Sequence, residues 1–254
     1  MRSKPIFIIG IDCATQSNKT GLALASLDNR WVRIIDVKVG SKNEPVAEII
    51  ENWLQQAQPA LLALDAPLGW PKQLAQSLPN HIAGEPLRGK SEELFSRMTD
   101  RFIWHEIGKK PLEVGANLIA RTAFSALKLL DTLRQDARLA IPLAWEQGII
   151  KETSAIEVYP AATLTALRIK ARDYRKEKGA RKKLVDKLGK HVGIETSQRK
   201  ILESNSHAID AVICVLAGTH FLLSECLKPE PNDQERARKE GWIWVKAVEN
   251  RVTS

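Results

Sequence analysis

Apolar residues at the start of the chain fall into short runs that polar turn residues separate. Such runs cover residues 6–12, 21–27 and 31–39, and the pair Asp28 and Asn29 separates the second run from the third. Runs of this length, bounded by turn residues, are typical of strands joined in hairpins. The pattern predicts a three-stranded antiparallel meander whose first strand is central in the sheet.

The next segment, residues 45–57, is predicted to be a helix, because its apolar residues recur every three or four positions. The further predicted elements are a strand over 60–65, a helix over 116–134, a strand over 156–159, a helix that begins at Pro160, and a last helix over 206–223 capped by Asn205 or Ser206. The element order β-β-β-α-β-α-β-α predicts an α/β protein with a mixed β-sheet flanked by helices.

Residues 72–115 interrupt this alternation. The segment is rich in proline, glycine and charge, with one short helix predicted around residues 92–98. Proline and glycine at positions 67–71 end the fourth strand before it. Because 254 residues is a common size for one elaborated α/β domain, we expect a single domain over residues 1–254, with an irregular insertion at 72–115 after the fourth strand.

Four carboxylates stand at the ends of apolar segments or inside them. They are Asp12 and Asp65 at the ends of the first and fourth strands, Glu157 in the fifth strand, and Asp210 in the last helix. A buried carboxylate loses hydration that only a cation or good hydrogen-bond donors can replace. Mg2+ and Mn2+ prefer oxygen ligands, so we expect these four residues to form a divalent metal site. Strand-terminal aspartates also cap turns through backbone N–H groups, and this interpretation stays open for Asp12 and Asp65.

Two further side chains are candidates for catalysis. Arg97 precedes Asp100 by three residues and Arg101 by four, so a helix would place all three on one face. Arg97 is a candidate for binding the scissile phosphate, with Asp100 fixing its guanidinium group, and a solvated helical ion pair is the alternative. His207 precedes Asp210 by three residues and is a candidate proton carrier, with a buried, hydrogen-bonded histidine as the alternative.

The formal net charge of +8 and the pI near 9.4 favour a polyanionic partner and say nothing about the fold. Lysine and arginine are densest in residues 168–190, so nucleic acid, either DNA or RNA, is the expected partner. The candidate nucleic-acid-binding residues are Arg172, Arg175, Lys176, Arg181, Lys182 and Lys183. A solvated basic helix is the alternative, because Tyr174 alone does not make a signature of base stacking.

Cysteine usage and hydropathy indicate the compartment. The chain has three cysteines, at positions 13, 214 and 226, without Cys-x-x-Cys spacing. This pattern favours reduced thiols and argues against a zinc site. The longest mainly apolar run, residues 207–223, contains two histidines and an aspartate, so we expect no membrane span. A cytoplasmic protein is the resulting expectation.

Five short signatures occur in a fixed order along the chain. They are Gly10-Ile11-Asp12, the stretch from Asp65 to Pro71, the stretch from Arg97 to Arg101, the stretch from Glu157 to Ala161, and Asp210-Ala211. Over residues 6–218 the chain thereby resembles a family catalogued as domain of unknown function 429. Members of that family are commonly described as predicted ribonuclease H-like nucleases, so the resemblance implies a ribonuclease H-like fold and nuclease activity. Where the family often has a second acid before the helix carboxylate, this chain has His207, so the number of metal ligands stays open.

Hydrolysis of a phosphodiester by two metal ions needs one bridging carboxylate and flanking carboxylates for each ion. Asp12 is the bridging candidate, Asp65 and Asp210 are the flanking candidates, and Glu157 is a ligand or orients one. We therefore expect a Mg2+- or Mn2+-dependent nuclease. Two alternatives stay open. One is a nucleotide-dependent phosphotransferase of the actin-like or sugar-kinase type, whose Thr- and Gly-bearing hairpin resembles residues 15–21, and the other is a catalytically silent nucleic-acid-binding module.

Overall fold

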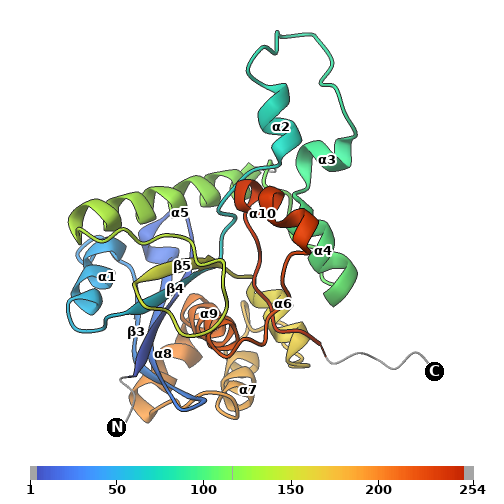
Figure 1. Ribbon diagram of the computed structural model, residues 1–254. Helices are drawn as coiled ribbons and strands as arrows, with labels where there is room; N and C mark the ends of the chain where they lie inside the picture. The colour runs from blue at the N-terminus through green and yellow to red at the C-terminus, as the bar shows by residue number, and fades with distance from the viewer. Residues whose placement is uncertain (1–4, 116, 249–254) are drawn as a thin grey trace.

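A five-stranded mixed sheet lies at the centre of the structure, a computed structural model that describes residues 5–115 and 117–248 (Figure 1). The strands are β1 (Ile6–Asp12), β2 (Gly21–Asp28), β3 (Trp31–Val39), β4 (Ala60–Leu64) and β5 (Ser154–Glu157), in the order β3-β2-β1-β4-β5. β2 pairs antiparallel with β1 and with β3, whereas β4 pairs parallel with β1 and with β5. These directions confirm the predicted α/β mixed sheet with a central first strand.

Helices cover both faces of this sheet (Figure 1). The helices of the body are α1 (Val46–Leu54), α5 (Asn117–Asp136), α6 (Pro160–Ala166), α7 (Lys178–Leu188), α8 (Thr196–Ser204) and α9 (Ser206–Leu222). Along β1, Ile9 and Ile11 belong to the core formed with α1 and α5, whereas Ile8 belongs to the core formed with α7, α8 and α9. Successive strand residues point to opposite faces, so the apolar run of this central strand serves two cores.

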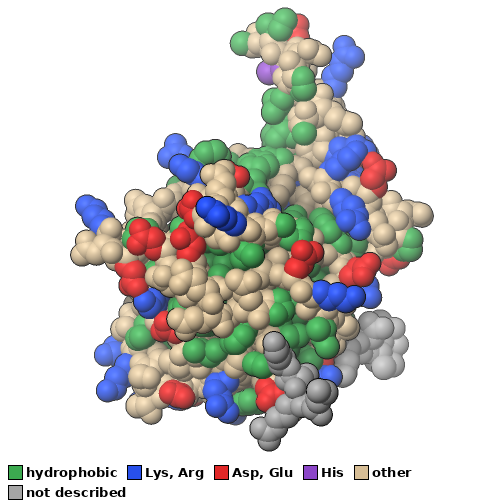
Figure 2. All heavy atoms as spheres, turned by 60° about the vertical axis from the view of Figure 1, so that its left-hand side comes forward, with side chains coloured by type: hydrophobic (Ala, Val, Ile, Leu, Met, Phe, Trp, Pro, Cys, Tyr) green, Lys and Arg blue, Asp and Glu red, His purple; other side chains and the backbone are tan. Residues whose placement is uncertain are grey.

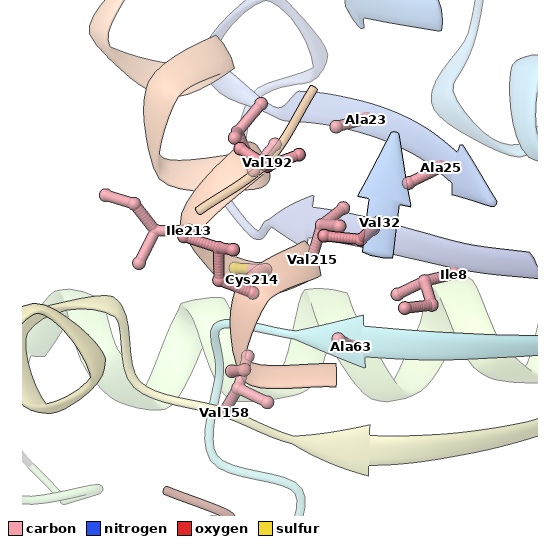
Figure 3. Packing of buried hydrophobic residues seen from close by; sticks show 14 of the residues in the cluster. Ile8, Ala23, Ala25, Val32, Ala63, Val158, Val192, Ile213, Cys214 and Val215 are labelled. Atoms are coloured by element: carbon pink, nitrogen blue, oxygen red, sulfur yellow. The ribbon is translucent and has the colours of Figure 1, made fainter. Parts of the chain in front are cut away.

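Helix α9 lies very close to the strands. A Cβ atom at Gly10 would lie 2.1 Å from the carbonyl oxygen of Ala211, and one at Gly21 would lie 2.0 Å from that of His207. Figure 3 shows the small side chain of Ala63 among the core residues around this helix. Because only glycine leaves room for such contacts, the start of α9 can lie directly beside the end of β1.

The last predicted helix is confirmed at its N-terminal boundary. It begins at Ser206, and the side chain of Asn205 accepts hydrogen bonds from two backbone N–H groups of its first turn. The helix predicted over residues 116–134 is α5, and Ala116 itself lies outside the described residues.

Within the described ranges, no single helix is long and apolar enough to cross a membrane. α8 and α9 meet that requirement only as a pair, which bends by 119°. In the structure α9 is buried along most of its length.

The segment 72–115 is more regular than its sequence predicts. It contains α2 (Lys72–Ser77), α3 (Ser91–Phe95) and α4 (Met98–Ile107), in place of the one short helix predicted around 92–98. The break before α4 arises because the Asp100 carboxylate accepts a hydrogen bond from the backbone N–H of Arg97 and caps the new helix. α4 packs against α6 and α10 (Gln234–Glu240), while α2 and α3 project from the body as an arm (Figures 1 and 2).

Candidate functional site

A cleft of about 1660 Å³ opens at the carboxyl ends of β1, β4 and β5. Asp12, Asp65, Glu157 and Asp210 all line it. The three strands are parallel and end at one edge of the sheet, and the contact of Gly21 with His207 holds the start of α9 at that same edge. The structure therefore brings the four predicted carboxylates to one cavity.

Asp12 and His207 form a direct pair in this cleft. The Nδ1 atom of His207 lies 2.7 Å from Oδ2 of Asp12. Burial raises the pKa of Asp12, against the opposing hydrogen bond and charge of His207. The same hydrogen bond raises the pKa of His207, although partial burial acts in the other direction. His207 therefore compensates part of the Asp12 charge.

Asp210 is held by two side chains from the segment between α6 and α7. The Tyr174 hydroxyl donates to Oδ1 at 2.6 Å, and Nη2 of Arg175 donates to Oδ2 at 3.0 Å. Burial of Asp210, followed by the negative charge of Asp12, raises its pKa to about 6, although Arg175 and Tyr174 act in the opposite direction. Arg175, predicted to bind nucleic acid, thus neutralises Asp210 in the free protein.

Asp65 stands at the end of β4 without such a partner. Within the described part of the chain, no hydrogen bond reaches its carboxylate. Burial raises the pKa of Asp65 well above its usual value, and the charges of Asp12 and Asp210 raise it further. Carboxylates that raise one another's pKa in this way lie close enough to form one electrostatic unit. We call Asp12, Asp65 and Asp210 the aspartate cluster.

Glu157 is engaged by Arg97. Its two oxygens accept hydrogen bonds from the guanidinium group at 2.7 and 2.8 Å, and Oε2 also accepts one from the backbone N–H of Leu68 at 2.9 Å. A cation at this carboxylate would have to displace a buried arginine, which is costly. The expected role of Glu157 as a metal ligand does not fit this arrangement.

Arg97 is buried, with 1% of its surface exposed, and uses all its side-chain donors within the protein. Nε and Nη2 donate to Asp100, Nη1 and Nη2 donate to Glu157, and Nη1 also donates to the carbonyl oxygen of Glu240. A guanidinium group has five N–H donors, and these bonds occupy them all. The predicted contact of Arg97 with a scissile phosphate therefore does not fit, and Arg97 instead joins α4, β5 and α10.

Cations from residues 168–187 form one side of the cleft. We call this side the basic wall, which consists of Arg168, Lys170, Arg172, Arg175, Lys183 and Lys187. Three of the predicted nucleic-acid-binding residues belong to it, whereas Lys176 and Lys182 are exposed outside the cleft lining. Arg181 donates to the backbone carbonyls of Tyr174 and Glu203 and so fixes the segment itself. Arg168, Lys170 and Lys187 lie within the basic segment 168–190 that the sequence predicted, although they were not named individually. Lys109 also lines the cleft, and no cluster of basic residues around it in the sequence predicted this position.

The profile of one protein family covers most of the chain. It is described as "Protein of unknown function (DUF429)" and matches residues 10–236, which include the aspartate cluster and the basic wall. The chain belongs to this family. A solved structure described as T. thermophilus RuvC in complex with Holliday junction substrate is similar at 14% sequence identity and a TM-score of 0.40, over 86% of this chain and 94% of that chain. No curated protein matches the sequence.

The donor set of the aspartate cluster in this DUF429 protein fits a hard divalent cation. It offers carboxylate oxygens, which Mg2+ and Mn2+ prefer, and the Asp65 carboxylate has no hydrogen bond within the described residues. As the side chains stand, the described residues contain no group of three or more Asp, Glu, His or Cys arranged to hold a metal ion. His207 bonds one oxygen of Asp12, whereas Tyr174 and Arg175 bond both oxygens of Asp210. A cation at Asp210 would therefore have to displace one of its two partners, while Asp12 could bind through its other oxygen.

Proposed function

We propose that this protein is a Mg2+- or Mn2+-dependent nuclease that hydrolyses phosphodiester bonds of nucleic acid in the cleft. The observation that carries the proposal is the aspartate cluster in a cleft with a basic wall. Carboxylates alone repel a polyanion, and cations alone only bind it. Together they supply metal ligands and phosphate contacts at one place, as phosphodiester hydrolysis requires.

Each residue of the cluster has a distinct part in this proposal. The charge of Asp12 raises the pKa values of both Asp65 and Asp210, so Asp12 is the residue whose carboxylate would serve both ions of a two-metal site. A bound divalent ion lowers the pKa of its water and offsets negative charge on the phosphate. His207 bonds Asp12 through Nδ1, which leaves its Nε2 to accept or release a proton in the cleft. Residues of the basic wall hold the phosphates of the strand.

The proposal is tested with single-stranded, double-stranded and branched DNA and RNA, incubated with Mg2+, Mn2+ or EDTA. We expect products from at least one substrate that form only with metal. If folded protein binds nucleic acid and yields no product with either metal, the nuclease proposal falls and the silent binding module takes its place.

Arg175→Gln is expected to increase the affinity of the free protein for Mn2+ on the order of tenfold. The guanidinium group bonds Asp210 and competes with the metal for that carboxylate, and its charge repels a cation nearby. Calorimetric titration with Mn2+, without nucleic acid, measures the change. Arg172→Gln is the matched control, because it removes the same charge from another position of the cleft. Equal affinities of the two variants would show that Arg175 does not compete for Asp210.

The stabilisation that a divalent cation provides is expected to depend on pH. Burial raises the pKa of Asp210 to about 6 and also raises the pKa values of Asp12 and Asp65. The folded chain therefore binds these protons more tightly than the unfolded chain, so the free energy of unfolding falls as pH rises from about 4 through about 6. A cation binds the deprotonated carboxylates and offsets this loss.

Melting temperatures in Mg2+ and in EDTA, compared at about pH 5 and about pH 8, measure this effect. We expect the larger difference at the higher pH and a much smaller one in Asp65→Asn. Equal shifts at both pH values, or a shift that Asp65→Asn retains in full, would place the bound cation elsewhere.

A further inference from the structure

The two sides of the cleft come from opposite faces of the sheet. The basic wall belongs to α7 and the segment before it, which lie on the face covered by α9 (Figure 1). The other side comes from the start of α5 and the segment before it, on the face covered by α1 and α5. Its lining residues Pro111, Leu112, Leu118 and Ile119 are here called the apolar wall. The aspartate cluster lies at the sheet edge between the two walls.

The apolar wall presents large aliphatic side chains to solvent. Leu112 is 66% exposed and Leu118 is 62% exposed, although both line a concave surface. Lys109 lies on the same side, so this wall is not free of charge, but six cations line the wall opposite. A ligand that covers exposed apolar side chains in a cleft removes them from water, which makes the free energy of binding more favourable. The unlike walls therefore indicate a ligand with one charged side and one apolar side.

Duplex and unpaired nucleic acid differ in whether they can present phosphates on one side and apolar base faces on the other. A duplex carries phosphates along both strands and keeps its base faces stacked and paired, so a cleft that grips it on two sides needs cations on both. An unpaired strand can turn its phosphates to one side and its base faces to the other. Free base faces bind well to aromatic and apolar side chains. Tyr159, which lines the cleft beside Glu157, offers an aromatic ring for such contact.

We infer that the cleft binds an unpaired strand of nucleic acid in preference to a continuous duplex. Its phosphates lie along the basic wall, its bases lie against Leu112 and Leu118, and the scissile phosphate is at the aspartate cluster. This inference rests on the proposed function and specifies the substrate class of the same site.

Fluorescence anisotropy in EDTA tests the inference, because no metal-dependent cleavage intervenes there. A labelled single strand is compared with the duplex of the same sequence, and we expect tighter binding of the single strand. The double variant Leu112→Ser, Leu118→Ser is expected to lose affinity for the single strand on the order of tenfold, with little change for the duplex. Both positions are exposed, so the fold is expected to tolerate the changes.

Phe124→Ser is the matched control. Phe124 is an apolar residue of α5 that is 65% exposed and lies outside the cleft lining, so its replacement is expected to leave both affinities unchanged. Tighter binding of the duplex, or equal losses for both substrates in the double variant, would overturn the inference. A double variant that changes only the oligomeric state, measured by light scattering, would assign the apolar wall to a second copy of the chain and also overturn it.

Cleavage assays with metal separate this inference from the nuclease proposal. A protein that binds and cleaves duplex as well as single strand keeps the nuclease proposal and loses the inference. Selective binding of the single strand without cleavage of any substrate has the opposite meaning, because the binding preference then stands and the nuclease proposal falls.

Discussion

Replacement of Asp12 by asparagine is expected to lower metal-dependent cleavage about a thousandfold. In the proposed site the Asp12 carboxylate would hold metal, and a neutral amide would not replace it; a loss of several kcal/mol of transition-state stabilisation gives a factor of this size. Initial rates in Mg2+ and in Mn2+ measure the effect. Folding is expected to persist, because Asp12 is a buried carboxylate whose raised pKa shows that its charged form is disfavoured in the folded protein.

Asp28→Asn is the control for this substitution. Asp28 is exposed at the end of β2, and the antiparallel pairing of β2 with β1 places it at the opposite edge of the sheet from Asp12. Its replacement removes the same charge and is expected to leave the rate unchanged. An Asp12→Asn protein that cleaves at the wild-type rate would contradict the central position of Asp12 in the proposed site.

Arg97→Met is expected to lower the free energy of unfolding by about 3–5 kcal/mol. The substitution leaves two buried carboxylates, Asp100 at 2% exposure and Glu157 at 4%, without their counter-charge. It also removes the donor to the carbonyl oxygen of Glu240, which joins α4 to α10. Urea denaturation followed by circular dichroism measures the change.

Two further variants identify the cause of that loss. Arg121→Met, at an exposed position of α5, is expected to change stability by less than about 0.5 kcal/mol. Glu157→Gln added to Arg97→Met is expected to recover part of the loss, because one unpaired buried charge is then absent. If Arg97→Met costs no more than the ~1 kcal/mol of a surface ion pair, its bonds to the two carboxylates are not maintained in solution.

The sheet and the aspartate cluster were predictable because their signals are local. Asp12 and Asp65 each follow an apolar run that forms a strand, and parallel strands end at the same edge of a sheet. Asp210 lies in a helix whose other residues are mostly apolar, so this helix was expected to pack on the sheet. Its packing places the Asp210 carboxylate near the sheet. The topology then brings the three together.

The partner of Glu157 was not predictable. Arg97 lies 60 residues away in the sequence, and nothing near Glu157 distinguishes a carboxylate that holds a cation from one that holds a distant arginine. The same region shows why the break between α3 and α4 was missed. Asp100 caps α4, while Arg97 binds Glu157 of β5 and the carbonyl of Glu240 in α10. Contacts between such distant residues leave no periodic pattern in the sequence.

The directions in which the basic side chains point were likewise not predictable from the sequence pattern. Charge density located the stretch, but Arg168 and Asp173 both adopt a positive φ of 56°, which turns the segment between α6 and α7 in a way that composition does not predict. These turns accompany the contact of Arg175 with Asp210 and the backbone contacts of Arg181. As a result, some predicted phosphate-binding residues are engaged within the protein.

The position of Mn2+ in crystals of the protein, located by anomalous scattering, is the most direct test of the central claim. We predict a peak at coordination distance, roughly 2 Å, from carboxylate oxygens of Asp12 and Asp65, with Asp210 released from Arg175. A well-ordered crystal grown in Mn2+ at about pH 8, with no peak between these carboxylates and with Asp12 still paired to His207, would contradict the claim that the aspartate cluster is a metal site.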